Sequence, residues 1–385
     1  MQTATTAEQT RCFKIFKAAV DNEKSFARYK YALDKFSIFT GLSYQEIIDL
    51  DTEDLQMKLE DWIMDMKTKK LRSSSIKTPL AGVCKFLDMN RKLYYKKILT
   101  SLIKPDKDVG GGYIPWANQD LQDMLTATKK LRTIALVHFF ASTGIRPQAL
   151  TDPVLHHKHM EIMYDENGKD TGCACVRVYD NSKEGYWAFL IPEARYALEK
   201  YTESRRLNGE RITPESVLFA THSDIAKVNH IAMDNLYSTL MNLVKQAGIK
   251  REKKGFRYDK AITYGFRKRF NTILKINNDV NSNIAEKLMA HKNGLDGTYL
   301  TPTREQCFAE FRKAIKDLTI SDKFRLQDTI VKKEQELQFY KTDINKKIFE
   351  LELTVKLLKE SRPISDDKAR DLAERINNQS SQNPQ

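Results

Sequence analysis

The sequence has few of the features that mark secreted or membrane proteins. Its five cysteines are an odd number in a chain of 385 residues, which argues against a disulfide framework and favours free thiols in a reducing compartment. No stretch approaches the roughly 18 consecutive apolar residues of a transmembrane helix. The first residues, MQTATTAEQTRCFKIF, lack the apolar core of a secretory signal. We therefore expect a cytoplasmic protein without a membrane partner.

Metal-binding patterns are also scarce. The chain has only seven histidines, of which His156, His157 and His159 stand together. Cys173 and Cys175 form a single C-x-C without a second pair. Because metal sites draw on sets of ligands with defined spacing, we predict no metal site and no cofactor. The cysteines are expected on a strand and the histidines in a polar loop.

What the sequence has in excess is positive charge. Lys and Arg outnumber Asp and Glu by 64 to 51, which gives a formal net charge of +13. Such an excess favours a polyanionic partner, most commonly nucleic acid, although the charge could also serve solubility alone. The length of 385 residues allows two or three domains. Hydrophobic residues make up 41% of the chain, so a sizeable buried core is possible.

The N-terminal hundred residues have a helical pattern. Apolar residues recur at helical spacing over 25–41, 54–67 and 75–90, and the basic segments KTKKLR (67–72) and RKLYYKK (91–97) follow the second and third of these helices. We expect a helical domain over 1–103. The segment KPDKDVGGGYIP (104–115) is predicted to be a flexible linker because three glycines stand together beside charges and a proline.

A second domain is expected over 116–320. A long helical pattern covers 121–143, and residues 173–180 and 186–192 are rich in β-branched and aromatic residues. The sequence NSKEG between these two strands is typical of a hairpin turn. Helical patterns then resume, so the fold class is mainly α with a small antiparallel β-sheet.

The C-terminal part has a different pattern. Residues 321–362 are predicted to form a long helix, in which Ile330, Leu337, Ile344, Leu351 and Leu358 recur every seven residues. This helix could form a coiled coil with a partner, pack on the body of the protein or stay exposed. The tail 363–385 is expected to be disordered because it is polar and ends in NNQSSQNPQ.

Five residues in the second domain could together break a phosphodiester without a metal. Two guanidiniums, Arg146 and Arg267, could clamp the non-bridging oxygens. The Tyr299 hydroxyl could attack phosphorus and stay attached as an ester, and Lys183 at the hairpin tip could protonate the leaving oxygen. His291 could form a hydrogen bond to a phosphate oxygen or exchange a proton with the tyrosine hydroxyl.

In this order, the residues resemble the motifs of the tyrosine recombinases (phage-type integrases), and most of all the archaeal members. The family carries T-G-x-R, a lysine in a β-hairpin, H-x-x-R, L-x-G-H and the nucleophilic tyrosine. The corresponding stretches of this sequence, in the same order, are TGIR, NSKEG, YGFR, LMAH and TYL, and they resemble the family motifs. The stretch HKNGLDGTYLTPTREQ is similar to a form common among the archaeal members. The resemblance covers about residues 20–320.

Three residues depart from the family pattern. Ala149 stands where a glutamate is usual, Tyr264 replaces the histidine of H-x-x-R, and Ala290 replaces a glycine. Because a phenol can donate a hydrogen bond but does not shuttle protons near neutral pH, Tyr264 is expected to contact phosphate. Arg269 and Lys169 compete with Arg267 and Lys183, which are preferred for their spacing.

The resemblance implies a site-specific recombinase that cleaves and rejoins duplex DNA through a 3′-phosphotyrosyl link, integrating or excising a mobile element. It implies an N-terminal core-binding domain, a catalytic domain, nucleoid association and a homo-tetramer on double-stranded DNA. The alternatives are DNA relaxation like that of a type IB topoisomerase, or a catalytically weak architectural protein on the same fold. The residues expected to contact DNA are Lys69, Lys70, Arg72, Lys77, Arg91, Lys92, Lys96, Lys97, Lys268 and Arg269.

Overall fold

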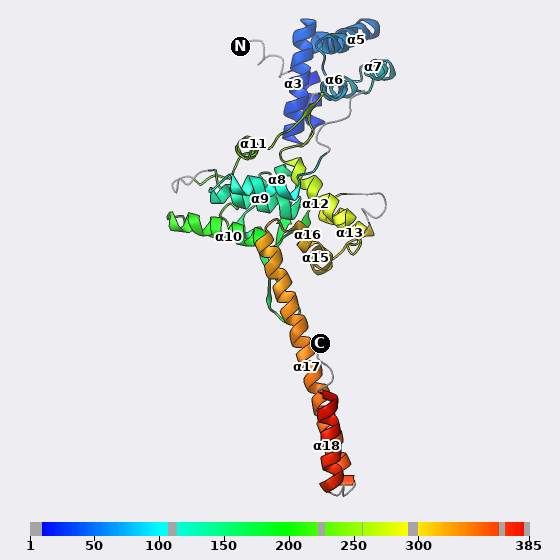
Figure 1. Ribbon diagram of the computed structural model, residues 1–385. Coiled ribbons are helices and arrows are strands. Elements are labelled where there is room, and N and C mark those ends of the chain that lie inside the picture. The colour runs from blue at the N-terminus through cyan, green and yellow to red at the C-terminus, as the bar shows by residue number, and fades with distance from the viewer. Residues whose placement is uncertain are drawn as a thin grey trace. The chain divides into compact units, whose positions relative to one another are not determined.

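The computed structural model describes residues 10–106, 114–221, 228–255, 257–291, 299–361 and 366–380 (Figure 1). The chain divides into two compact units, Met1–Val109 and Gly110–Gln385, and this division falls inside the segment expected as a linker. Within the described ranges, no helix combines the length and the apolar character needed to span a membrane.

The first unit is built only of helices in its described part. They are α2 (Arg11–Ala18), α3 (Glu23–Thr40), α4 (Tyr44–Asp49), α5 (Thr52–Thr68), α6 (Ser73–Met89) and α7 (Lys96–Leu102). The core of this unit includes the fully buried rings of Phe16, Phe36 and Phe86. Helices α3 and α6 pack closely because Gly82 brings α6 against the backbone of Tyr29, where an added Cβ would lie at 3.1 Å.

The second unit combines helices with two small sheets. Its helices are α8 (Asn118–Thr126), α9 (Leu131–Thr143), α10 (Pro192–Leu207), α11 (Met233–Gln246), α12 (Tyr264–Ile276), α13 (Ser282–Leu288), α15 (Arg304–Lys313), α16 (Ile315–Leu318), α17 (Asp322–Ser361) and α18 (Asp366–Ser380). Two 3₁₀ turns, η1 (Pro147–Leu150) and η2 (His157–His159), follow α9. The strands are β1 (Met160–Tyr164), β2 (Asp170–Val178), β3 (Tyr186–Leu190), β4 (Lys253–Lys254) and β5 (Arg257–Tyr258).

The main sheet is antiparallel in the order β1-β2-β3, and Val176 pairs with both Met160 and Ala188. Helices α9 and α10 lie side by side beside this sheet (Figure 1). The Ser142 hydroxyl ties α9 to β3 because it donates to the Phe189 carbonyl at 3.0 Å and accepts from the Ile191 amide at 2.8 Å. A mainly helical fold with a small antiparallel sheet is therefore confirmed.

Two details of the second unit differ from the sequence prediction. The single helix expected over 121–143 is two helices. The Thr128 hydroxyl accepts from the Lys130 amide in the break between them. Of the two, only α9 is buried along most of its length. The edge strand β1 was not predicted. Its residues are mostly exposed, so it lacks the apolar pattern that marks a strand in sequence.

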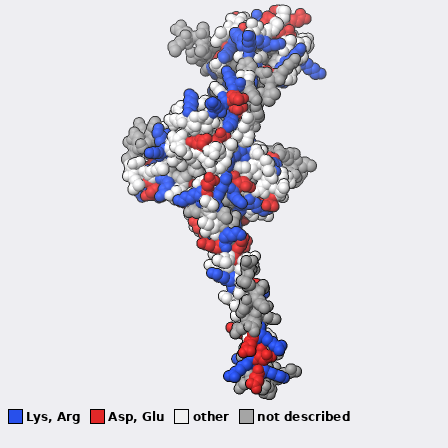
Figure 2. Space-filling view, viewed as in Figure 1, with Lys and Arg blue, Asp and Glu red and all other residues white. Residues whose placement is uncertain are grey.

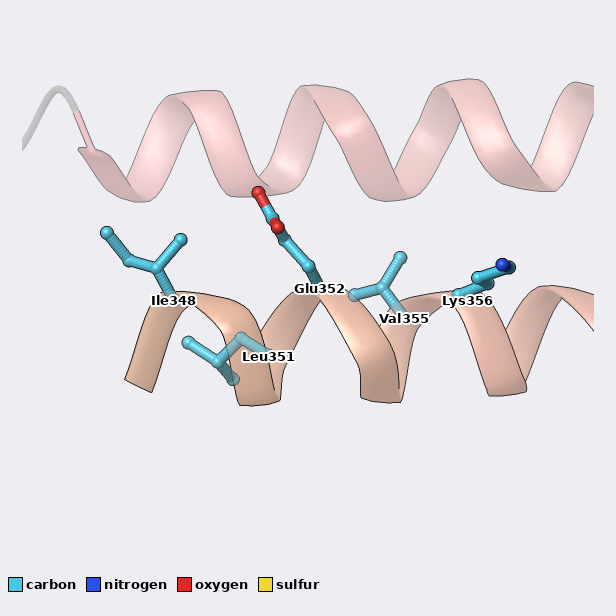
Figure 3. A pocket seen from close by; sticks show the side chains of 5 residues that line it. All are labelled: Ile348, Leu351, Glu352, Val355 and Lys356. Atoms are coloured by element: carbon cyan, nitrogen blue, oxygen red, sulfur yellow. The ribbon is translucent and has the colours of Figure 1, made fainter. Parts of the chain in front are cut away.

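The C-terminal segment forms a helical hairpin. Helix α17 starts against α10, where the rings of Phe324 and Tyr196 lie 6.0 Å apart. Helix α18 lies alongside the second half of α17, and Ile348, Glu352 and Val355 project between them (Figure 3). Residues 366–380 are therefore helical rather than disordered as predicted, because the expectation weighed polarity and missed an apolar helical face that includes Leu372.

Candidate active site

Arg146 takes its position from the end of α9. Gly144 ends this helix with φ +57°, and a Cβ at Gly144 would lie 2.4 Å from the Phe270 ring. Only glycine fits both the left-handed backbone and the close contact. The chain then turns through Arg146 into η1, which begins at Pro147. The half-buried Arg146 guanidinium donates to the Ala290 carbonyl at 3.4 Å.

Arg267 comes from the first turns of α12. Gly265 lets this helix approach Trp116, whose ring would lie 2.5 Å from an added Cβ. The Arg267 side chain is buried at 7% exposure. One nitrogen of its guanidinium donates to the Gly144 carbonyl at 2.7 Å, and the other donates to the Met289 carbonyl. Both arginines therefore donate to the segment 289–290, Arg146 to the Ala290 carbonyl and Arg267 to the Met289 carbonyl.

Arg269 has a different environment. Two residues along a helix point to nearly opposite sides, and Arg269 is buried at 4% exposure. Its guanidinium donates to Asn118 at 3.2 Å and to the Leu318 carbonyl at 3.1 Å. These bonds tie α12 to α16, so the structure disagrees with the expectation that Arg269 contacts DNA. The geometry favours Arg267 as the partner of Arg146.

His291 lies in a chain of hydrogen bonds behind Arg267. Its Nε2 is 3.0 Å from an Arg267 nitrogen and its Nδ1 is 2.6 Å from a Glu286 oxygen. Because a guanidinium only donates, we assign the proton to Nδ1 and the lone pair to Nε2. The other Glu286 oxygen is 2.6 Å from the Lys275 ammonium. Burial raises the Glu286 pKa, but the hydrogen bonds from Lys275 and His291 outweigh it and lower the pKa overall.

Neither guanidinium forms a salt bridge in the described part of the chain, although the charges of Asp152 and Glu184 act on Tyr179 together with those of the two arginines. No carboxylate there pairs with Arg146 or Arg267, and the carbonyls bonded to them carry no net charge. Burial, and then the positive charge of Arg146, lower the pKa of Arg267. Two adjacent cations without a carboxylate form a site that an anion would stabilise, and a phosphate oxygen matches their donors.

The main sheet presents one of its ends to these arginines. Burial raises the pKa of both Tyr179 and Tyr186, and the charges of Arg146 and Arg267 act in the opposite direction on both. Tyr179 and Tyr186 flank the β2–β3 turn that carries the exposed Lys183. Lys169 lies beyond the other end of β2, roughly 30 Å away along a strand of this length. The placement therefore favours Lys183 over Lys169.

The two remaining tyrosines are accessible. Tyr264 begins α12 and is 53% exposed, and it lies close enough to Arg267 to interact with it electrostatically. Tyr299 is 78% exposed, and no hydrogen bond joins it to the described residues. The preceding residues 292–298, which include most of the motif after His291, lie outside the described residues. The structure thus brings together Arg146, Arg267 and His291, and shows no contact of Tyr299 with them.

The expected DNA contacts of the first unit are largely accessible. Figure 2 shows Lys and Arg side chains on the face of this unit in view. Lys92 is half-buried and donates to the Leu50 carbonyl, and Arg72 is also half-buried. In the second unit, Lys268 is half-buried. The exposed members of the first unit are Lys69, Lys70, Lys77, Arg91, Lys96 and Lys97.

No group of metal-binding side chains occurs among the described residues. Cys173 and Cys175 lie on β2 and are buried free thiols. Burial raises the pKa of the Cys173 thiol to about 12, so this side chain is neutral near pH 7. The histidines at 156–159 lie in and just before η2.

Sequence reasoning missed several residues of this site. Glu286 and Lys275 orient His291, and Tyr186 lies beside the arginines. The position of Glu286 five residues before His291 was a weak signal, since the end of α13 folds the two together. Nothing in the sequence distinguishes Tyr186 from an ordinary strand tyrosine.

Comparison with known proteins gives structural likenesses only. No family model and no curated protein matches the sequence. The chain is similar to a lambda integrase dimer bound to a core site, with a TM-score of 0.48 and 14% identity over 76% of this chain and 94% of that one. It is also similar to XerH recombinase bound to its difH substrate, with a TM-score of 0.45 and 15% identity over 68% and 69%.

A third likeness is to the integrase of the mycobacterium phage Brujita, with a TM-score of 0.39 and 14% identity over 81% of this chain and 93% of that one. All three proteins are recombinases or integrases, the class that the sequence motifs resemble. Because likenesses at these identities and scores do not determine a reaction, the side-chain geometry carries the proposal that follows.

Proposed function

We propose that this chain is a tyrosine-type site-specific DNA recombinase of the integrase class, which integrates or excises a mobile element. One observation carries the proposal. Two adjacent guanidiniums, Arg146 and Arg267, have no carboxylate partner among the described residues and lie with His291 near the sheet end that bears Lys183. Such a site can bind one anion through hydrogen bonds from both guanidiniums. The net charge of +13 favours a polyanion as the partner.

In the proposed reaction the Tyr299 oxygen attacks the scissile phosphorus. A bond forms between this oxygen and phosphorus, and the bond from phosphorus to the 5′ oxygen breaks. The His291 Nε2 lone pair, once released from the Arg267 N–H that it accepts in the free protein, takes the phenolic proton, and Lys183 protonates the departing 5′ oxygen. Arg146 and Arg267 stabilise the charge on the non-bridging oxygens.

The product is a 3′-phosphotyrosyl ester and a free 5′ hydroxyl. The ester keeps the energy of the broken bond, so a 5′ hydroxyl from a second duplex can attack it without a nucleotide cofactor. The exposure of Tyr299 is compatible with attack in its own site or in that of a neighbouring copy.

The Tyr299→Phe variant tests the proposal because it removes only the nucleophilic oxygen. A DNA substrate nicked near the cut site traps the covalent adduct, which a denaturing gel separates from free DNA. We expect wild-type protein to form the adduct, and Tyr299→Phe to bind the same DNA without forming it. An adduct that persists in Tyr299→Phe would refute the nucleophile assignment. Plasmid relaxation by wild-type protein without site preference would instead support a topoisomerase.

We further propose that four copies assemble on two DNA duplexes and that α17 contributes to their contacts. Ile330, Leu337 and Ile344 of its heptad pattern are more than half exposed in the single chain, which is costly for a helix in water. Sedimentation of the protein mixed with paired DNA sites measures the number of copies. One copy on each duplex at saturating protein would contradict this assembly.

A further inference from the structure

One buried hydroxyl beside the two arginines has no role in the reaction described above. Tyr186 is the first residue of β3 and pairs with Val178 across the sheet. Its side chain is only 8% exposed. Its hydroxyl oxygen is inaccessible to water and makes no well-formed hydrogen bond to the described residues. Arg267 lies close enough to act on it as a donor, so what the hydroxyl lacks is an acceptor for its proton. Most buried polar groups in proteins are paired, so an unpaired one requires an explanation.

The surroundings of this hydroxyl explain why its proton has no acceptor. The charges of Arg267 and Arg146 both act on the phenol, and the Tyr179 ring lies 6.2 Å from the Tyr186 ring. A guanidinium can donate to the phenolic oxygen but has no lone pair to accept its proton. Burial raises the pKa of Tyr186 to about 12, so the phenol keeps its proton near pH 7. The site therefore holds a third donor without an acceptor.

An anion held by the two arginines would supply the missing acceptor. We propose that the Tyr186 hydroxyl donates a hydrogen bond to a non-bridging oxygen of the phosphate held by Arg146 and Arg267. This inference rests on the proposed function, because it takes that phosphate to be the scissile one. Tyr186 would then be a second phenol that donates to the phosphate. The first is Tyr264, which stands in the usual histidine position and is half-exposed at the start of its helix.

The donor is well suited to stabilise a transition state. It is neutral, and the register of the sheet holds its ring in place. Because the hydroxyl is covered in the free protein, the groups beside it must shift as the phosphate binds, after which the donor is already in position when charge develops. In the free protein the same hydroxyl is costly, because it is buried without a partner for its proton. A purely structural tyrosine would show the reverse, with a satisfied hydroxyl in the free protein.

The Tyr186→Phe variant removes this hydroxyl and leaves the ring. We expect single-turnover adduct formation on the nicked substrate to slow by about ten- to a hundredfold, with DNA affinity changed less than about threefold. The melting temperature should stay the same or rise, since the variant has no unsatisfied hydroxyl. Tyr164→Phe, on the exposed edge strand β1 of the same sheet, is the matched control and should behave as wild type.

Phosphorothioate substrates locate the contact even if the variant is less stable. Sulfur replaces one non-bridging oxygen of the scissile phosphate, and the two stereoisomers are tested separately. We expect the Tyr186→Phe defect to vanish with one isomer, because sulfur is a poor acceptor, and to persist with the other. An equal defect with both isomers, or a wild-type rate for Tyr186→Phe on the ordinary substrate, would overturn the inference. Absence of any adduct with wild-type protein would overturn the proposed function instead.

Discussion

At the scale of single residues, the state of His291 is set by Glu286. The carboxylate accepts the Nδ1 proton at 2.6 Å, and this leaves the Nε2 lone pair facing Arg267 at 3.0 Å. A histidine with its tautomer fixed in this way can accept a proton only at Nε2, after the Arg267 N–H has turned away from that atom. Lys275 holds the other carboxylate oxygen, so the orientation of the ring depends on a chain of three side chains.

The Glu286→Gln variant should slow adduct formation by about ten- to a hundredfold, since a neutral amide no longer favours the tautomer with the proton on Nδ1. We expect DNA affinity to change less than about threefold and the pH at which the rate falls to shift. Single-turnover rates across pH measure both effects. Glu310→Gln, which removes another carboxylate of lowered pKa that bonds to Lys313 and the Asn281 amide, should leave the pH profile unchanged.

The same variant has a pH-dependent effect on stability. The folded-state pKa of Glu286 is lowered from its ordinary value of 4.5. The carboxylate therefore stabilises the fold above this value, and the stabilisation is lost as pH falls through the folded-state pKa. Thermal melts should show wild type more stable than Glu286→Gln at pH 7, with the difference shrinking below pH 4.5. A difference that grows in acid would contradict the assigned hydrogen bonds.

At the scale of elements, the site depends on where two helices terminate. Helix α9 must end at Gly144 so that Arg146 turns toward the Ala290 carbonyl, and α12 must begin near Trp116 so that Arg267 reaches the Gly144 carbonyl. The Gly144 position combines a left-handed φ with a close contact to Phe270. The glycine of the T-G-x-R motif is thus explained by packing between α9 and α12.

The Gly144→Ala variant should lose about 2–4 kcal/mol of unfolding free energy, from backbone strain and from overpacking against Phe270. Gly248 has a similar φ of +66° with no atom within 4 Å of an added Cβ. Gly248→Ala is therefore the matched control, with an expected loss of about 1 kcal/mol from strain alone. Chemical denaturation of both variants measures the difference, and equal losses would show that the Phe270 contact does not matter.

At the scale of the whole molecule, positive charge should determine how binding depends on salt. Removing one cation that binds a phosphate makes the slope of log K against log salt about 0.9 less negative. Lys96 and Lys97 are exposed on the helical unit, so Lys96→Ala with Lys97→Ala should reduce the slope by up to about 2. Binding titrations over a range of salt concentrations measure it.

A control with the same change in net charge separates direct phosphate binding from bulk charge. Lys333 and Lys347 on α17 are already paired with Glu336 and Asp343. Replacing both by alanine should leave the slope nearly unchanged. If the two double variants shift the slope equally, general charge rather than phosphate binding by Lys96 and Lys97 accounts for the affinity.

The sequence by itself determined the fold class, the longer helices α3, α5 and α6 of the first unit, and the order of Arg146, Lys183, Arg267, His291 and Tyr299. These features depend on local periodicity, turn residues and motif spacing, which neighbouring positions encode. It favoured Arg267 over Arg269 and Lys183 over Lys169 from motif spacing alone. In each pair both residues have the same chemistry, so the physical reason for the choice comes from the packing of distant segments, as the bonds of Arg269 to Asn118 and Leu318 show.

Only the tertiary structure decided which side chains lie together around Arg146 and Arg267. Glu286 and Tyr186 join Arg267 there, although they lie 19 and 81 positions from it in the sequence. Their roles follow from burial and from the donors and acceptors that face them. Such long-range contacts leave no pattern among adjacent residues, because folding brings the partners together from different helices and strands.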